Sequence, residues 1–195
     1  MRIRATGGPV YQLKVTLRGI RPPIWRRFLV PGDIPLKRLH DALQAVMGWT
    51  DSHLHQFKAH RLVYGTSDRE FGIERVSERT TTLDQVLRQP KASLRYEYDF
   101  GDGWEHDVVL ETVLAAEPEG RYPWILAGAR ARPPEDVGGS YGYAGFLEIL
   151  ANPGHPEFAE SLEWAGGAFD PAAFDVGEAN LAIHGGWVRR KPGAG

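Results

Sequence analysis

The chain has 195 residues, of which 42% are hydrophobic and 25% are charged, proportions typical of soluble globular proteins. No apolar run approaches the roughly 20 residues that a membrane helix requires, and the N-terminal segment lacks the apolar stretch of a secretory signal. The absence of cysteine excludes disulfides, thiolate metal ligands and a cysteine nucleophile. These features predict a cytoplasmic, bacterial protein with no membrane partner.

Charge is divided unevenly along the chain. Residues 1–96 carry 17 Lys and Arg against 8 Asp and Glu, a net charge of +9, whereas residues 97–180 carry 3 against 17, a net charge of −14. Either the basic half binds a nucleic-acid backbone, or the two halves fold against each other and neutralise. The sequence pI of about 6.4 favours neutralisation, because dedicated nucleic-acid-binding domains usually exceed a pI of about 9.

Apolar periodicity predicts most of the secondary structure. A run at helical spacing begins after Pro35 and ends at Gly48, which predicts a helix over 36–47 because proline suits a helix start and glycine a helix end. Residues 117–142 are rich in proline and glycine and are predicted to form a loop. The other predicted elements are strands over 10–19, 24–30, 53–59, 61–64, 93–100 and 104–114, and short helices over 82–87, 145–151, 156–165 and 175–183.

Strands early, one long helix, more strands and then short helices predict the α+β class. We expect a single compact, roll-like domain over residues 10–187 with a mostly antiparallel sheet. The long helix belongs to its N-terminal half and the short helices to its C-terminal part. Residues 1–9 are expected to be a flexible N-terminus and residues 188–195 a disordered tail.

The two strands around residues 101–103 predict a hairpin with a charged outer side. A three-residue loop would set Phe100 opposite Trp104 on an apolar face, since register follows the apolar pattern. The other face would then set Asp99 opposite Glu105 and Glu97 opposite Asp107, and like charges directly opposite destabilise a sheet. Water, a divalent cation or arginines could compensate them. The candidate arginines are Arg18, Arg21, Arg26 and Arg27.

His53 and His55 lie two residues apart in a predicted strand, so both should point to one face, as paired metal ligands do. A third ligand could be His60, His106 or a carboxylate. His106 also falls on the apolar hairpin face, which equally suits a hydrogen-bonded core histidine. Carboxylates and imidazoles gathered in one cleft could perform general acid–base catalysis. The candidate catalytic residues are Asp99, Asp102, Glu105, His106, Glu135 and Asp136.

Tryptophans interleaved with arginines could stack bases or line a binding groove, or they could fill the core. This pattern is strongest near the N-terminus, around the RPPIWRR segment. The candidate binding residues are Arg21, Trp25, Arg26, Arg27 and Trp104.

Several stretches of the chain form a family pattern: YQLKV (11–15), RPPIWRR (21–27), LHDALQAVMGW (39–49), HLHQF (53–57), YEYDFGDGWEH (96–106), YP (122–123), LAG (126–128), PPED (133–136), GG (138–139) and GY (142–143). Together they resemble the plasmid pRiA4b ORF-three-like family, some members of which are labelled TnpR-like passenger proteins of insertion elements. The resemblance implies a compact α+β, roll-like domain but no established activity, and the label suggests a link to mobile DNA. Family members often have cysteines where this chain has Ile125, Arg132 and Val137, so a metal site built on those cysteines would be missing here.

Three hypotheses about function follow. The first is a non-enzymatic binding or accessory module with an unknown protein or small-ligand partner. The second is a metal-dependent or acid–base hydrolase that uses the histidines and carboxylates above. The third is nucleic-acid binding through the basic N-terminal third. No cofactor is predicted apart from a divalent metal under the second hypothesis, and the deciding question is whether residues 53–55, 99–106 and 133–136 converge on one site.

Overall fold

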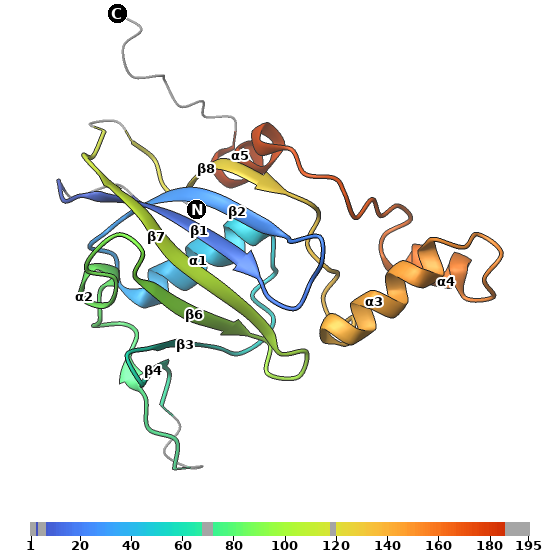
Figure 1. Ribbon diagram of the computed structural model, residues 1–195, viewed down its shortest axis with the longest axis horizontal. Helices are drawn as coiled ribbons and strands as arrows, with labels where there is room; N and C mark the ends of the chain where they lie inside the picture. The colour runs from blue at the N-terminus through green and yellow to red at the C-terminus, as the bar shows by residue number, and fades with distance from the viewer. Residues whose placement is uncertain (1–2, 4–6, 68–71, 118–119, 186–195) are drawn as a thin grey trace, which may run out of the picture.

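The computed structural model of the protein (Figure 1) describes residues 3, 7–67, 72–117 and 120–185. Its centre is one eight-stranded sheet in the order β5-β4-β3-β6-β7-β1-β2-β8. Neighbouring strands are antiparallel, except for the parallel pair β4 and β5. The strands are β1 (Val10–Leu17), β2 (Trp25–Pro31), β3 (His55–Ala59), β4 (Leu62–Gly65), β5 (Val76–Ser77), β6 (Ser93–Tyr98), β7 (Trp104–Leu114) and β8 (Trp124–Ala129).

Helices cover one face of this sheet and leave the other, here called the open face, exposed. Figure 1 shows α1 crossing behind the strands, α5 beside β8, and α3 with α4 projecting to one side. Leu39 and Leu43 of α1 are fully buried, because residues at this spacing share one side of a helix. The helices are α1 (Leu36–Met47), α2 (Leu83–Val86), α3 (Gly139–Leu150), α4 (Phe158–Trp164) and α5 (Val176–His184).

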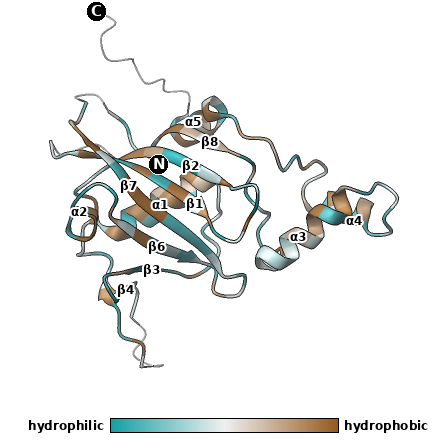
Figure 2. Cartoon of the chain, in the orientation of Figure 1, coloured by the Kyte–Doolittle hydropathy of each residue, from teal (hydrophilic) through white to brown (hydrophobic). Residues whose placement is uncertain are grey.

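The predicted α+β class with a mostly antiparallel sheet is therefore confirmed. Along β6 and β7, teal and brown residues both occur (Figure 2), as expected for strands with one buried face. The short helix predicted over 82–87 is present as α2, and Thr82 caps it in a capping box, in which the backbone N–H of Thr82 donates to the side chain of Gln85.

The prediction of a continuous loop over 117–142 is wrong, because β8 lies within it and pairs with β2. The segment WILAGA has no clear alternation, and its pairing is fixed by contacts from distant residues. Asn180 of α5 accepts a hydrogen bond from the N–H of Ile125 and donates one to its carbonyl, at 2.9 and 2.8 Å. Tertiary structure here overrides the local signal.

The hairpin register differs from the prediction by two residues. Tyr98, rather than Phe100, lies opposite Trp104, and Tyr96 lies opposite His106. Asp99 leaves the ladder in a left-handed conformation (φ 58°), and its carbonyl accepts the N–H of Gly103 at 2.7 Å. A shift of two residues preserves which strand side chains face the core, so the predicted faces hold within β6 and β7. The prediction is wrong for the two residues after β6, because Phe100 is 41% exposed and Asp99 is buried.

Cations on neighbouring strands compensate the carboxylates of the open face. Arg95 donates to Glu105 and to Asp107 at 3.2 and 3.4 Å, and Arg18 lies 3.8 Å from the same two carboxylates. Glu97 accepts from Lys58 at 2.6 Å. Among the arginines predicted for this role, Arg18 fills it. The basic and acidic halves therefore interleave across this face, which supports mutual neutralisation.

The structure places part of the terminal segments. Ile3 is buried and forms an isolated bridge with Tyr122, whereas residues 1–2, 4–6 and the predicted tail lie outside the described residues. Within the described ranges, no helix is both long and apolar enough to cross a membrane.

Candidate metal centre

Three segments that are distant in sequence meet at one end of the sheet: residues 50–55, 99–103 and 133–138. The N–H of Asp99 donates to the carbonyl of Leu54 at 2.9 Å. The N–H of Gly138 donates to Asp102 at 3.2 Å, and Glu135 accepts from the N–H of Thr50 at 2.8 Å. We call this surface the three-loop face. It brings together the motifs whose convergence the sequence left open.

The centre of the three-loop face is a group of three side chains, here called the loop triad: His53, Asp99 and Asp136. His53 Nε2 lies 3.1 Å from Asp136 Oδ1 and 3.7 Å from Asp99 Oδ2. One donor atom from each residue lies within 4.8 Å of the other two. The side chain of Asp99 is 8% exposed and that of Asp136 is 71% exposed, so the triad opens to solvent on one side.

Local backbone conformation aims these carboxylates. Asp99 and Asp136 have φ of 58° and 57°, a conformation that side-chain-bearing residues adopt infrequently and that clusters at functional sites. Asp99 Oδ1 accepts from the N–H groups of Gly101 and Asp102 at 2.9 and 3.3 Å. The hydrogen bonds to Oδ1 hold the carboxylate in place while Oδ2 faces His53.

Two further features make the loop triad suited to a metal ion. His53 Nε2 is buried and makes no well-oriented hydrogen bond with any described group, although Asp136 is only 3.1 Å away. A donor set of one imidazole nitrogen and two carboxylate oxygens suits first-row transition ions such as Mn²⁺, Fe²⁺ or Zn²⁺. The exposure of Asp136 would leave coordination positions open to water or a partner.

A second histidine–carboxylate group lies on the helix side of residues 51–55. This inner triad consists of His40 on α1, Asp51 and His55, with one donor atom from each within 4.8 Å of the others. The two imidazoles stack with centroids 3.4 Å apart and planes 8° from parallel. His40 Nε2 contacts Asp51 Oδ1 at 2.7 Å, and His55 Nε2 contacts Glu78 at 2.8 Å.

Buried polar groups orient the inner triad. Tyr96 Oη lies 2.8 Å from His40 Nδ1 and accepts from Gln44 at 2.8 Å, and Gln44 in turn accepts from the N–H of Asp51 at 2.8 Å. Burial, followed by the neighbouring His55, lowers the pKa of His40 to about 4. Burial is the largest influence on the pKa of Glu78 and would raise it, but the hydrogen bond from His55, together with the nearby charges of His55, Lys37 and His40, holds that pKa below its ordinary value.

The prediction that His53 and His55 point to one face is wrong. The strand β3 begins at His55, so His53 precedes it and turns to the loop triad while His55 turns to the inner triad. His60, a suggested third ligand, hydrogen-bonds the carbonyl of Val86 at 3.0 Å instead.

The remaining catalytic candidates lie in different environments. His106 is fully buried in the core, where Trp49 donates to its Nε2 at 3.2 Å. Burial lowers its pKa to about 4, so it is a neutral core histidine. Glu105 belongs to the open face, whereas Asp102 and Glu135 support the three-loop face through Gly138 and Thr50.

The arginines and tryptophans suggested as binding residues do not form one surface. Arg26 is buried, and it donates to the carbonyls of Trp25, Ala129 and Arg130 at 2.8 to 2.9 Å. Trp104 is also buried. Arg27 pairs with Glu111 at 2.6 Å, and Arg21 lines a separate shallow hollow that also contains Asp107.

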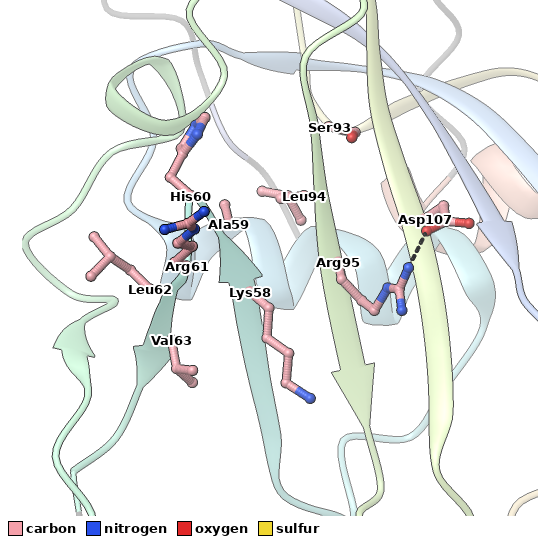
Figure 3. Close-up of a pocket in the computed structure, with 10 residues that line it drawn as sticks. All are labelled: Lys58, Ala59, His60, Arg61, Leu62, Val63, Ser93, Leu94, Arg95 and Asp107. Atoms are coloured by element: carbon pink, nitrogen blue, oxygen red, sulfur yellow. Dashed lines mark hydrogen bonds and ion pairs between the residues drawn. The ribbon is translucent and has the colours of Figure 1, made fainter.

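A hollow on the open face gathers basic side chains, but they do not converge on one point. Figure 3 shows Lys58, Arg61 and Arg95 pointing in different directions, with Arg95 joined to Asp107. Lys58 is paired with Glu97 at 2.6 Å. Two of these three cations are thus already paired with carboxylates, which disfavours this hollow as a nucleic-acid backbone site.

Sequence reasoning missed His40, Asp51 and Glu78. His40 lies between Leu39 and Leu43 in an apolar helical run, and a histidine at such a position is expected to be a core residue rather than a ligand. Glu78 lies between the elements predicted over 61–64 and 82–87, in a polar stretch with no periodic pattern. Asp51 offered the one usable signal, because it lies only four residues before His55 in the sequence.

The fold and this site define an α+β protein with a mostly antiparallel sheet and two histidine–carboxylate groups at one end. Residues 9–178 match the family described as "Plasmid pRiA4b ORF-3-like protein", and the chain belongs to this family. It is 44% identical over 177 residues to "Uncharacterized protein y4hQ" of Sinorhizobium fredii (strain NBRC 101917 / NGR234), covering 89% of this chain and 90% of that protein.

A solved structure supports the same fold. The crystal structure of the protein of unknown function MM3350 from Methanosarcina mazei Go1 is similar with a TM-score of 0.79 and 38% identity. The similarity covers 89% of this chain and 98% of that one. Of the three positions that the resemblance singled out for cysteine, Val137 directly follows Asp136 of the loop triad, Arg132 precedes the 133–138 segment and Ile125 lies in β8.

Proposed function

We propose that the protein is a divalent-cation-binding module whose site is the loop triad. The observation that carries the proposal is the meeting of His53, Asp99 and Asp136 from three separate loops, with a buried His53 Nε2 that lacks a well-oriented hydrogen bond. An imidazole nitrogen placed between two carboxylates is a ligand arrangement that proteins use for metals.

Charge balance supports the same conclusion. Two carboxylates carry a charge of −2, and a single imidazolium would neutralise only half of it. The ion-pair partner of both Asp99 and Asp136 is His53, rather than a lysine or an arginine. A divalent cation would neutralise both carboxylates while leaving His53 neutral, the form that coordinates metals.

Exposed apolar side chains beside the triad favour a binding role for the ion over a catalytic one. Leu54 is 71% exposed and follows His53, and Phe100 is 41% exposed and follows Asp99. Apolar groups around a polar centre are typical of a surface that a partner covers. The non-enzymatic module is therefore the function that this geometry supports best, with the ion as part of its contact surface.

Metal analysis of dialysed protein tests the proposal. After dialysis against Zn²⁺ or Mn²⁺, the metal content per chain is measured by mass spectrometry for the wild type, Asp136→Asn and the control Glu148→Gln, which changes an exposed carboxylate on α3. We expect Asp136→Asn to lower the metal affinity of one site by at least about tenfold, because loss even of a residue that only orients a metal ligand commonly lowers affinity by this factor. The control should bind as much metal as the wild type. Equal metal content in all three proteins would contradict the proposal.

Solvent access to Asp136 also favours one alternative, hydrolysis by a metal-bound water. Metal-dependent release of p-nitrophenol from bis-p-nitrophenyl phosphate, abolished by Asp136→Asn, would support that alternative. Metal-saturated wild-type protein that releases none is the result expected for a binding module.

A further inference from the structure

The inner triad and the neighbouring Glu78 place two carboxylates against two stacked imidazoles. Asp51 and Glu78 each contact an imidazole, His40 and His55 respectively. Glu78 is almost fully buried, with a side chain 3% exposed. The nearby ammonium group of Lys37 is paired with Asp41 at 3.6 Å. A carboxylate as dehydrated as that of Glu78 requires positive charge or hydrogen-bond donors close by, whereas the side chain of Asp51 is 54% exposed and opens the group to solvent.

Protons on the two histidines cannot readily supply that charge. The rings lie face to face with centroids 3.4 Å apart, and two imidazolium charges at this separation repel strongly in a region of low dielectric constant. A single divalent cation would place positive charge beside Asp51 and Glu78 while both rings stay neutral, the form of histidine that coordinates metals.

We propose that His40, Asp51 and His55 form a second divalent-cation site, oriented by Glu78 and Tyr96. The proposal goes beyond the loop triad and does not depend on that triad being occupied, because the two sites share no ligand. In this site Asp51 would supply a carboxylate oxygen, His40 would supply Nε2 and His55 would supply Nδ1.

The hydrogen bonds already select those nitrogens. Glu78 occupies Nε2 of His55 at 2.8 Å, which leaves Nδ1 of that ring for an ion. Tyr96 Oη lies 2.8 Å from Nδ1 of His40, so an ion would bind that ring at Nε2, where it would replace the 2.7 Å hydrogen bond with Asp51. Metal-bound histidines commonly donate their second ring N–H to a carboxylate or another oxygen, which fixes the tautomer and the ring direction.

Ion binding at this site requires the rings to move. A metal ion lies close to the plane of each imidazole that binds it, so two parallel rings 3.4 Å apart must turn out of their stack to share one ion. His55 is the ring with room to do so, since its side chain is 12% exposed whereas that of His40 is fully buried. Loss of the stack is therefore a signature of occupancy.

Stoichiometry tests this proposal separately from the loop triad. The full chain is titrated with Zn²⁺ by calorimetry and analysed for bound metal, using the wild type, Asp51→Asn, Asp136→Asn and the double variant. We expect two ions per chain in the wild type, one in each single variant and none in the double variant. Asp51→Asn retains an oxygen that can accept from His40, and Asp51 is about half exposed, so the variant should stay folded.

The outcomes distinguish the two proposals. An Asp51→Asn protein that binds as much Zn²⁺ as the wild type overturns the second site, whereas an Asp136→Asn protein that does so overturns the first. Absence of Zn²⁺ from the wild type overturns both. A second measurement needs no variant: the ring-nitrogen resonances of His40 and His55 should shift by tens of parts per million on Zn²⁺ addition while those of His106 stay unchanged, and unshifted His40 and His55 resonances at saturation overturn the second site.

Discussion

The open face of the sheet and the three-loop face both carry several carboxylates, but they compensate them differently. On the open face, Glu97, Glu105 and Asp107 each have a lysine or arginine partner. On the three-loop face, Asp99 and Asp136 have only His53 as an ion-pair partner among the described residues. The first surface completes its charge balance with the chain's own cations, whereas the second leaves positions that an added cation can fill. The difference separates structural carboxylates from candidate ligands.

The largest expected effect concerns an imidazole that belongs to neither face. Burial lowers the pKa of His106 to about 4, below the value near 6.5 of an unfolded chain. Because the folded pKa is the lower one, this contribution to stability is fully present above pH 6.5 and is lost as the pH falls toward 4, by up to about 3 kcal/mol.

Urea unfolding of the wild type and of His106→Gln between pH 7.5 and pH 4 measures this contribution. Glutamine can still accept from Trp49, so the variant retains that contact. The variant should lose markedly less stability than the wild type over the interval. Parallel pH profiles for the two proteins would show that His106 is not held neutral.

Metal addition should stabilise the protein through the three-loop face but not through the open face, by an amount similar to the contribution of His106. An ion at 100 times its dissociation constant stabilises the folded state by about 2.7 kcal/mol per site, which raises the melting temperature of a chain of this size by about 5–11 °C. Calorimetric scans with Zn²⁺ and with a chelator measure the shift. A variant lacking Asp136 should lose part of it, whereas Arg95→Gln on the open face should retain all of it; an identical shift in both variants would remove the distinction between the faces.

The smallest expected effect is on the open face itself. Arg95 contacts Glu105 and Asp107 at 3.2 and 3.4 Å, but the three side chains are 35%, 35% and 48% exposed, respectively. Exposed pairs contribute about 1 kcal/mol or less, so Arg95→Gln should lower the free energy of unfolding by no more than this. The loss should shrink in 1 M NaCl, since salt screens exposed charges, and a loss of several kcal/mol that resists salt would contradict this account.

The sequence predicted the parts of the fold that local pattern determines. The α1 helix follows from its apolar spacing between Pro35 and Gly48, and the buried faces of β6 and β7 follow from alternation. The register between β6 and β7 could not be predicted in this way, because a two-residue shift leaves the same strand side chains buried. Only the left-handed turn at Asp99 decides between the two registers. Likewise, β8 depends on Asn180, which lies 55 residues from Ile125.

The candidate site was predicted as a set of residue types, but not as a geometry. His53, Asp99 and Asp136 were all candidates, and they do meet. The sequence could not show that His53 and His55 separate, because this depends on where β3 begins. It also could not connect His40 on α1 and Glu78 after β5 to Asp51 and His55, since tertiary packing alone brings those elements together.

The most direct test of the central claim is a crystal structure of the protein soaked with Mn²⁺ or Zn²⁺, with anomalous diffraction measured at the metal's absorption edge. The account predicts an anomalous peak about 2.0–2.2 Å from His53 Nε2 and from carboxylate oxygens of Asp99 and Asp136, the usual metal–ligand distances. A crystal of metal-saturated protein with no peak between these three side chains would contradict it.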